Sequence, residues 1–189
     1  MIDKFFLSLL TMFGIGYYKN APGTLASFVT CLIYYILMSN LMPFVISTGI
    51  FWFIFAVLFI ASVSLINEYS KNFKKTDPKE IVIDEFLGQS IPILYLTSQY
   101  PMETRSIWPI SGLFPERVNY QIDEPTVILL FLIPFVFFRL FDIYKPYPIN
   151  LIDEKMKNCW GIVLDDIIAG IYAAAASHVF MLILIYLFW

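Results

Sequence analysis

The feature that most constrains this chain is a run of 48 residues, Asn20 to Asn67, without a charged side chain. A membrane-spanning helix needs about 20 apolar residues, so the run is long enough for two. Ser39-Asn40-Leu41-Met42-Pro43 interrupts it and predicts a hairpin between helices at Thr24–Met38 and Phe44–Ile66. Only 14% of all residues are charged, whereas soluble domains carry about a quarter. The solvent around this chain must therefore be partly lipid.

Three further apolar segments follow, at Ile81–Tyr100, Pro125–Phe141 and Ile162–Trp189. The start, Met1–Phe13, has a weakly basic beginning and a short apolar stretch, which predicts a short interfacial helix rather than a cleaved signal peptide. The polar residues 99–124 predict a loop on the outer side of the membrane. The sequence therefore predicts one all-α integral-membrane domain over residues 1–189, with about five membrane-embedded helices.

The distribution of basic residues predicts which side of the membrane is the cytoplasmic one. Five crossings with the N-terminus inside place ten of the twelve Lys and Arg residues on the inner face. Only Arg105 and Arg117 then lie outside. Cytoplasmic loops are enriched in Lys and Arg, so this orientation is favoured over its inverse.

In this topology four polar motifs reach the same depth on the inner face, where the apolar segments begin or end. They are Asn20-Ala21-Pro22-Gly23-Thr24, Asp84-Glu85, Arg139 with Asp142 and Lys145, and Asp165-Asp166. Charges beside membrane segments are costly and usually serve a function. The motifs are far apart in sequence, so their common depth predicts one site.

The acidic residues predict a metal site. Carboxylates that converge without matching cations repel each other, and a hard divalent ion such as Mg²⁺ or Mn²⁺ relieves that repulsion with oxygen ligands. Asp84, Glu85, Asp165 and Asp166 are the expected metal ligands, and together with Asp142 they are the expected catalytic carboxylates.

The remaining motif residues predict a phosphate site beside the metal. Arg139 offers a planar fork of donors and Lys145 a point charge, and both suit phosphate oxygens. Asn20, Gly23 and Thr24 stand at a predicted helix start, where backbone N–H groups and a hydroxyl bind anions. Gly88 and Gly170 follow the acidic pairs by one turn and predict a close helix–helix approach.

Three of the four motifs also have a plain structural explanation. Asp165 or Thr24 can cap a helix, Arg139 and Asp142 can form a local ion pair, and Pro22-Gly23 can be a simple turn. Taken one at a time these explanations are strong, but they do not account for four motifs at one depth. Asp153-Glu154 beside two lysines predicts a solvated loop face, and His178 predicts a packed helix residue.

Several classes of protein are excluded. The net charge of −3 gives no indication of a nucleic-acid partner. The single histidine, in mid-segment, rules out phosphoryl transfer by paired histidines, and the chain has no P-loop and no Cys-(x)₅-Arg loop. Cys31 and Cys159 lie far apart and do not predict a disulfide framework.

These motifs together resemble those of a known family. They are Ala21-Pro22-Gly23-Thr24, Asp84-Glu85-x-x-Gly88, Phe138-Arg139-x-Phe141-Asp142-x-x-Lys145-Pro146-x-Pro148-Ile149, and Gly161-Ile162-x-x-Asp165-Asp166-x-x-Ala169-Gly170. In type and order they resemble the phosphatidylglycerophosphatase A family, over most of the chain. The Arg/Asp/Lys-Pro-x-Pro block is the most specific part of the resemblance.

The resemblance implies a function. Members of that family are Mg²⁺-dependent enzymes of the bacterial inner membrane that remove the terminal phosphate from phosphatidylglycerophosphate. It implies a phospholipid substrate, an active site on the cytoplasmic face, and functional roles for the acidic and basic residues of the matching motifs. A homo-oligomer is compatible with the sequence, which does not decide the oligomeric state.

Two other functions stay open at this point. A small cation- or proton-coupled transporter would also carry membrane-embedded acids, although such a protein should place one near the midplane, and here the acids gather at one end. An accessory helical protein that binds lipid without chemistry is the third hypothesis. Metal-dependent phosphate release separates the enzyme from both.

Overall fold

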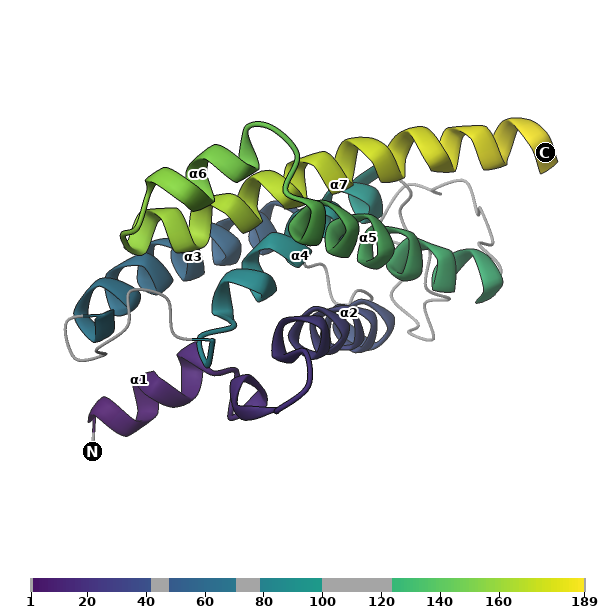
Figure 1. Ribbon diagram of the computed structural model, residues 1–189. Coiled ribbons are helices and arrows are strands. Elements are labelled where there is room, and N and C mark those ends of the chain that lie inside the picture. Colours follow the sequence, from purple (N-terminus) through teal and green to yellow (C-terminus); the bar gives the residue numbers. More distant parts are fainter. Residues whose placement is uncertain (1, 42–47, 71–78, 100–123, 189) are drawn as a thin grey trace.

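The computed structural model describes residues 2–41, 48–70, 79–99 and 124–188, and these residues form helices with no strand among them (Figure 1). The elements are α1 (Ile2–Leu10), the 3₁₀ turn η1 (Ile15–Tyr17), α2 (Pro22–Leu41), α3 (Thr48–Ser70), α4 (Ile83–Gln99), α5 (Glu124–Tyr144), α6 (Ile149–Lys155) and α7 (Cys159–Phe188). The prediction of an all-α fold is confirmed for these residues.

The five predicted apolar segments correspond to α2, α3, α4, α5 and α7. Helix α2 starts with Pro22, whose fixed φ suits a first helical position, and it continues to Leu41, so Ser39 and Asn40 belong to the helix and not to a hairpin. Residues 42–47 and most of the predicted outer loop, 100–123, lie outside the described part of the chain.

Two short elements were not predicted, the 3₁₀ turn η1 and helix α6. Helix α6 has only seven residues, Ile149–Lys155, and follows the Pro-rich turn after α5. So short a segment spans barely two turns, and its apolar residues cannot establish a helical period. The turn carries α6 back along α7, beside which it lies in Figure 1.

Two of the described helices are long and apolar enough to cross a membrane. They are Gly49–Tyr69 in α3, with a mean hydropathy of 2.5, and Cys159–Leu187 in α7, with a mean hydropathy of 2.1. Pro22–Met38 in α2 is apolar but shorter. The number of five crossings therefore stays a prediction, and so does the side on which each motif lies.

The surroundings of these two helices distinguish them from the core helices of a soluble protein. Only 22% of the α3 segment and 33% of the α7 segment are buried inside the protein. Large apolar side chains such as Phe53, Ile60 and Leu187 point outward instead. A helix that is apolar on all sides and mostly unburied needs lipid around it, so this is a membrane protein.

Helix α4 is the centre of the bundle, because it packs against α2, α3, α5 and α7. Every residue from Leu87 to Leu94 is buried. Pro92 lies inside the helix and has no N–H, so it cannot donate to the carbonyl of Gly88 one turn earlier. Gly170 of α7 packs against that carbonyl.

Two glycines bring the backbones of α4 and α7 into contact. A Cβ atom on Gly170 would overlap the carbonyl oxygen of Gly88. A Cβ atom on Gly88 would lie 2.6 Å from the carbonyl oxygen of Asp166 and 2.6 Å from the Phe138 ring. The predicted close approach is confirmed. It holds the acidic first turn of α4 close to Asp165-Asp166 in the second turn of α7.

We predict that Gly170→Ala destabilises the protein by about 1–3 kcal/mol, because the added methyl group has no room at the crossing. Helix propensity alone would make Gly170→Ala stabilising, since alanine is favoured over glycine by about 1 kcal/mol inside a helix. The check is the thermal unfolding midpoint in detergent, with the outward-facing Ala175→Leu on the same helix as control. A midpoint for Gly170→Ala at or above that of the wild type would contradict the tight crossing.

Candidate active site

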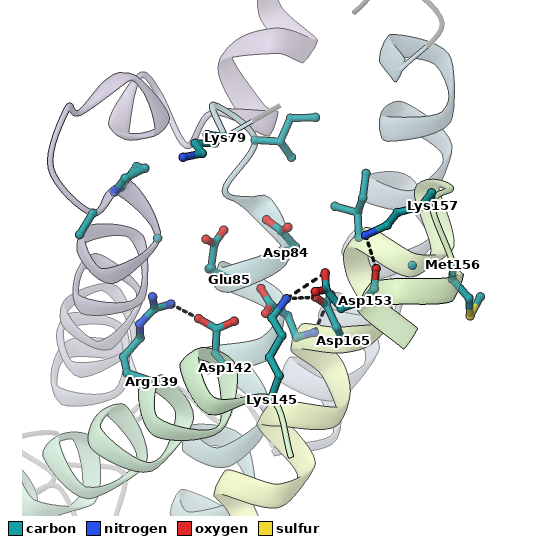
Figure 2. A pocket seen from close by; sticks show the side chains of 17 residues that line it. Lys79, Asp84, Glu85, Arg139, Asp142, Lys145, Asp153, Met156, Lys157 and Asp165 are labelled. Carbon is teal, nitrogen blue, oxygen red and sulfur yellow. Dashed lines mark hydrogen bonds and ion pairs between the residues drawn. The ribbon is translucent and has the colours of Figure 1, made fainter. Parts of the chain in front are cut away.

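One cavity of about 300 Å³ gathers the charged motifs of the chain (Figure 2). Its acidic residues are Asp84, Glu85, Asp142, Asp153, Asp165 and Asp166, and its basic residues are Lys79, Arg139, Lys145 and Lys157. The cavity lies where α2, α4 and α7 begin and α5 ends, with α6 along one side. Segments far apart in the sequence therefore meet at one end of the bundle, as predicted.

Local hydrogen bonds hold the starts of α4 and α7 in place. Asp84 and Glu85 occupy the first turn of α4, where the helix dipole favours negative charge. Just before them, the buried Val82 donates its N–H to the carbonyl of Leu10 (3.0 Å) and ties this turn to α1. In α7 the side chain of Asn158 accepts the N–H of Gly161 (3.0 Å). Asn158 therefore caps α7, and the alternative that Asp165 is only a cap is wrong.

Three carboxylates form a compact group, in which Asp166 is buried and Asp84 and Glu85 are partly buried. One oxygen from each of Asp84, Glu85 and Asp166 lies within 4.8 Å of the others. Asp84 Oδ1 and Glu85 Oε2 are buried and have no hydrogen-bond partner. Within the described part of the chain, no basic side chain forms an ion pair with any of the three. Buried like charges are costly unless a cation lies between them, and the arrangement is one that a metal ion could fill.

The start of α2 closes one side of this group. Gly23 is buried, and a Cβ atom there would overlap Glu85 Oε1 and lie 3.4 Å from Arg139 Nη1. The glycine is required because the Glu85 carboxylate packs directly on the backbone of the first turn. Pro22-Gly23 is therefore more than a turn before a helix, since it forms part of the cavity wall.

The predicted local ion pair between Arg139 and Asp142 is present. Arg139 Nη1 lies 2.6 Å from Asp142 Oδ2, and both side chains are largely buried. The same nitrogen also donates to Ser27 Oγ, at 3.5 Å, so α2 and α5 are joined here. A guanidinium has five N–H donors, so these contacts leave it able to bind an anion as well.

Lys145 lies between two carboxylates. Its Nζ is 2.8 Å from Asp165 Oδ2 and 3.1 Å from Asp153 Oδ1. Burial lowers the pKa of Lys145, but hydrogen bonds and charge from Asp165 and Asp153 outweigh it, so the pKa lies above its ordinary value. The lysine therefore stays charged at neutral pH. Figure 2 shows its ammonium aimed at the two carboxylates.

This pairing divides the predicted metal ligands into two kinds. Asp84, Glu85 and Asp166 are the compact group without basic partners. Asp165 is next in sequence but points to Lys145, and its Oδ1 accepts the N–H of Asp166 (3.0 Å). Its carboxylate thus lies beside the compact group and outside it.

Most of the predicted site residues line the cavity. Three charged residues that were not predicted to belong to the site line it as well: Lys79, Asp153 and Lys157. Gly23 lines it, whereas Asn20 and Thr24 do not, and Asn20 is exposed. The prediction of a solvated loop face at Asp153-Glu154 is confirmed for the exposure of Glu154 but wrong about the loop, because both residues lie in α6. The Asp153 side chain is 39% exposed and also contacts Lys145.

Sequence reasoning also missed Lys79 and Lys157. Lys157 Nζ donates to the backbone carbonyl of Asp153. The charges of both lysines and of Asp153 were visible in the sequence, but their distances to the motifs were not. His178 lies elsewhere, in an edge-on contact with Tyr95 (5.5 Å between ring centroids), as expected of a packed helix residue.

Comparison with known proteins finds relatives that cover most of the chain. The family model described as Phosphatidylglycerophosphatase A matches residues 8–181. A phosphatidylglycerophosphatase A from Haemophilus influenzae is 31% identical over 161 residues, which cover 85% of this chain and 79% of that protein. One from Escherichia coli is 26% identical over 170 residues, covering 88% of this chain and 77% of that protein.

A third relative carries a different name. A putative phosphatidylinositol-3-phosphatase from Bacteroides thetaiotaomicron is 28% identical over 166 residues, covering 86% of this chain and 85% of that protein. No solved structure matches the chain. The family model covers nearly the whole chain, including every charged motif that lines the cavity. The chain therefore belongs to the phosphatidylglycerophosphatase A family.

Proposed function

We propose that this protein is a Mg²⁺-dependent lipid phosphatase that hydrolyses phosphatidylglycerophosphate to phosphatidylglycerol and phosphate. The observation that carries the proposal is the division of charge in one cavity. Asp84, Glu85 and Asp166 have no basic partner, while Arg139 and Lys145 are held beside them in ion pairs. A cation site next to a phosphate site is what metal-assisted phosphoryl transfer requires.

The residues present fit a magnesium ion. The buried oxygens of Asp84 and Glu85 without hydrogen-bond partners offer hard ligands, and Asp166 completes the group. Asp165 can support the group through its contact with the Asp166 backbone. A bound Mg²⁺ would supply positive charge against which the developing charge on the phosphoryl oxygens is stabilised.

The chain's own cations would bind and orient the phosphate. Arg139 on α5 offers N–H donors, and the partly exposed Lys145, just beyond the end of α5, offers an ammonium. Gly23, in the first turn of α2, lines the same cavity. Held by both cations, the monoester would be oriented toward the carboxylates, which is the positioning on which phosphoryl transfer mainly depends.

The position of the cavity suits a lipid substrate. It lies at the end of the bundle, where α2, α4 and α7 begin, while the apolar outer surfaces of α3 and α7 face away from the protein. A phospholipid could keep its acyl chains in the bilayer and place its headgroup in the cavity. The basic residues of the inner loops favour the cytoplasmic face of a bacterial inner membrane, with a multi-pass topology.

The phosphatase activity is tested by measuring phosphate release from a panel of lipid phosphates. With Mg²⁺ we expect turnover of phosphatidylglycerophosphate and none with EDTA. Phosphatidylinositol 3-phosphate belongs in the panel, because it too carries a phosphomonoester on a polyol headgroup. Metal-dependent release from the inositol lipid alone would overturn the assigned substrate, and release from neither would overturn the enzyme.

Substitutions test which carboxylates act. Asp84→Asn and Asp166→Asn should each lower kcat by on the order of 100-fold or more, since each removes a charged oxygen from the compact group. The exposed Glu154→Gln removes a carboxylate without touching the cavity and should behave like the wild type. Near-normal turnover in both aspartate variants would contradict the proposed site.

Metal binding can be measured without any substrate. Mn²⁺ takes the same ligands as Mg²⁺ and reports its binding by electron paramagnetic resonance. We expect Glu85→Gln and Asp166→Asn to weaken Mn²⁺ binding by on the order of 10–100-fold, and Glu154→Gln to leave it unchanged. Equal Mn²⁺ affinity in all these proteins would show that the compact group is not the metal site.

A further inference from the structure

Helix α6 is held firmly against the start of α7. Ile149 at its beginning is fully buried together with Phe138. The hydroxyl of Tyr172 on α7 donates to the backbone carbonyl of Tyr147 (3.2 Å) just before α6. At the other end, Gly161 has no side chain where the carbonyl of Met156 comes close. Both ends of this short helix are thus tied to α7.

This placement brings one carboxylate of α6 into the cavity. Asp153 Oδ1 lies 3.1 Å from Lys145 Nζ, on the far side of the ammonium from α5 (Figure 2). Lys157 in turn donates to the backbone carbonyl of Asp153. The next residue along α6, Glu154, is exposed and does not line the cavity. Only one of two adjacent acids therefore contacts the charged motifs.

We propose that Asp153 is a positioning residue: together with Asp165 it holds the Lys145 ammonium between α6 and α7, so that the remaining N–H donor of the lysine is directed to the substrate phosphate. The proposal rests on the phosphate-binding role given to Lys145 under the proposed function. It adds a residue outside the charged motifs of α2, α4, α5 and α7. It also assigns a function to α6, which places Asp153 beside Lys145.

The donor count of an ammonium group supports this role. Lysine has three N–H donors, and in the described structure two of them are directed to Asp165 and Asp153. The third remains for a phosphate oxygen, in a direction set by the other two. Without Asp153 the ammonium keeps one fixed contact, at 2.8 Å to Asp165, and can rotate about it. The expected effect is weaker phosphate binding, with the metal ligands intact.

The experiment compares four proteins: the wild type, Asp153→Asn, Asp153→Glu and the neighbouring Glu154→Gln. The first readout is the affinity for inorganic phosphate in the presence of Mg²⁺, by calorimetry, which needs no turnover. The second is KM and kcat on phosphatidylglycerophosphate.

Because the ion pair is partly exposed, we expect Asp153→Asn to weaken phosphate binding and raise KM by about three- to fivefold, with kcat changed less. Asp153→Glu should recover part of the loss, and Glu154→Gln should show none.

A double-mutant cycle with Lys145→Met separates positioning from a structural role. If Asp153 acts through Lys145, Asp153→Asn should cause no further loss of phosphate affinity once Lys145 is replaced. An equal loss in both backgrounds, with a lowered unfolding midpoint, would mean that Asp153 only stabilises α6 and would overturn the proposal. The proposal would also be overturned if Asp153→Asn bound phosphate as tightly as the wild type, or if the wild type did not bind phosphate.

The two proposals fail in different ways. A wild type that binds phosphate but releases none from any lipid phosphate would refute the proposed function, while the cycle would still show whether Asp153 positions Lys145. A wild type that turns over the lipid, with an Asp153→Asn variant indistinguishable from Glu154→Gln, would refute the positioning role alone.

Discussion

The contact between α4 and α7 is the interaction on which the rest of the structure depends. Gly88 and Gly170 have no side chains, so the two backbones touch, and a Cβ atom on either would collide with the other helix. Each glycine lies one turn beyond an acidic pair. Their contact therefore sets the distance between Asp84-Glu85 and Asp165-Asp166, and with it the size of any cation that these residues could share. In a membrane, where apolar side chains gain little by leaving lipid, such close backbone packing is a main source of helix association.

The acidic residues around this contact fall into two sets, which differ in whether they have a basic partner. Asp142, Asp153 and Asp165 each have a basic partner, and they hold Arg139 and Lys145 in place. Asp84, Glu85 and Asp166 form no ion pair among the described residues, although their oxygens are crowded together. The negative charge of the first set is balanced, at least in part, by Arg139 and Lys145. The second set has no such partner among the described residues, which is why we propose that a metal ion binds there and that the substrate phosphate binds the paired cations beside it.

The bundle presents two kinds of surface, which suits an enzyme acting on a lipid. The sides of α3 and α7 are apolar and largely unburied, as lipid-facing helices are. The end at which α2, α4 and α7 begin is polar and hollow. The small helix α6 belongs to that end, and its fixed ends make it part of the wall of the cavity. A headgroup that enters the cavity would exchange water for preorganised charges while its acyl chains stay in the bilayer.

The sequence by itself determined the helical class, the five long apolar segments, the motifs that would meet and the need for small residues at the helix crossing. It could do so because hydrophobic runs, helix starts and glycine spacing are local signals. The tertiary structure alone decided which carboxylates are paired and which are not, that Asp153 on the unpredicted helix α6 contacts Lys145, and that Asn20 and Thr24 do not line the cavity. Ion pairing depends on distances of a few ångströms between side chains from different helices, and those distances are set by how the helices pack, which no single stretch of sequence contains.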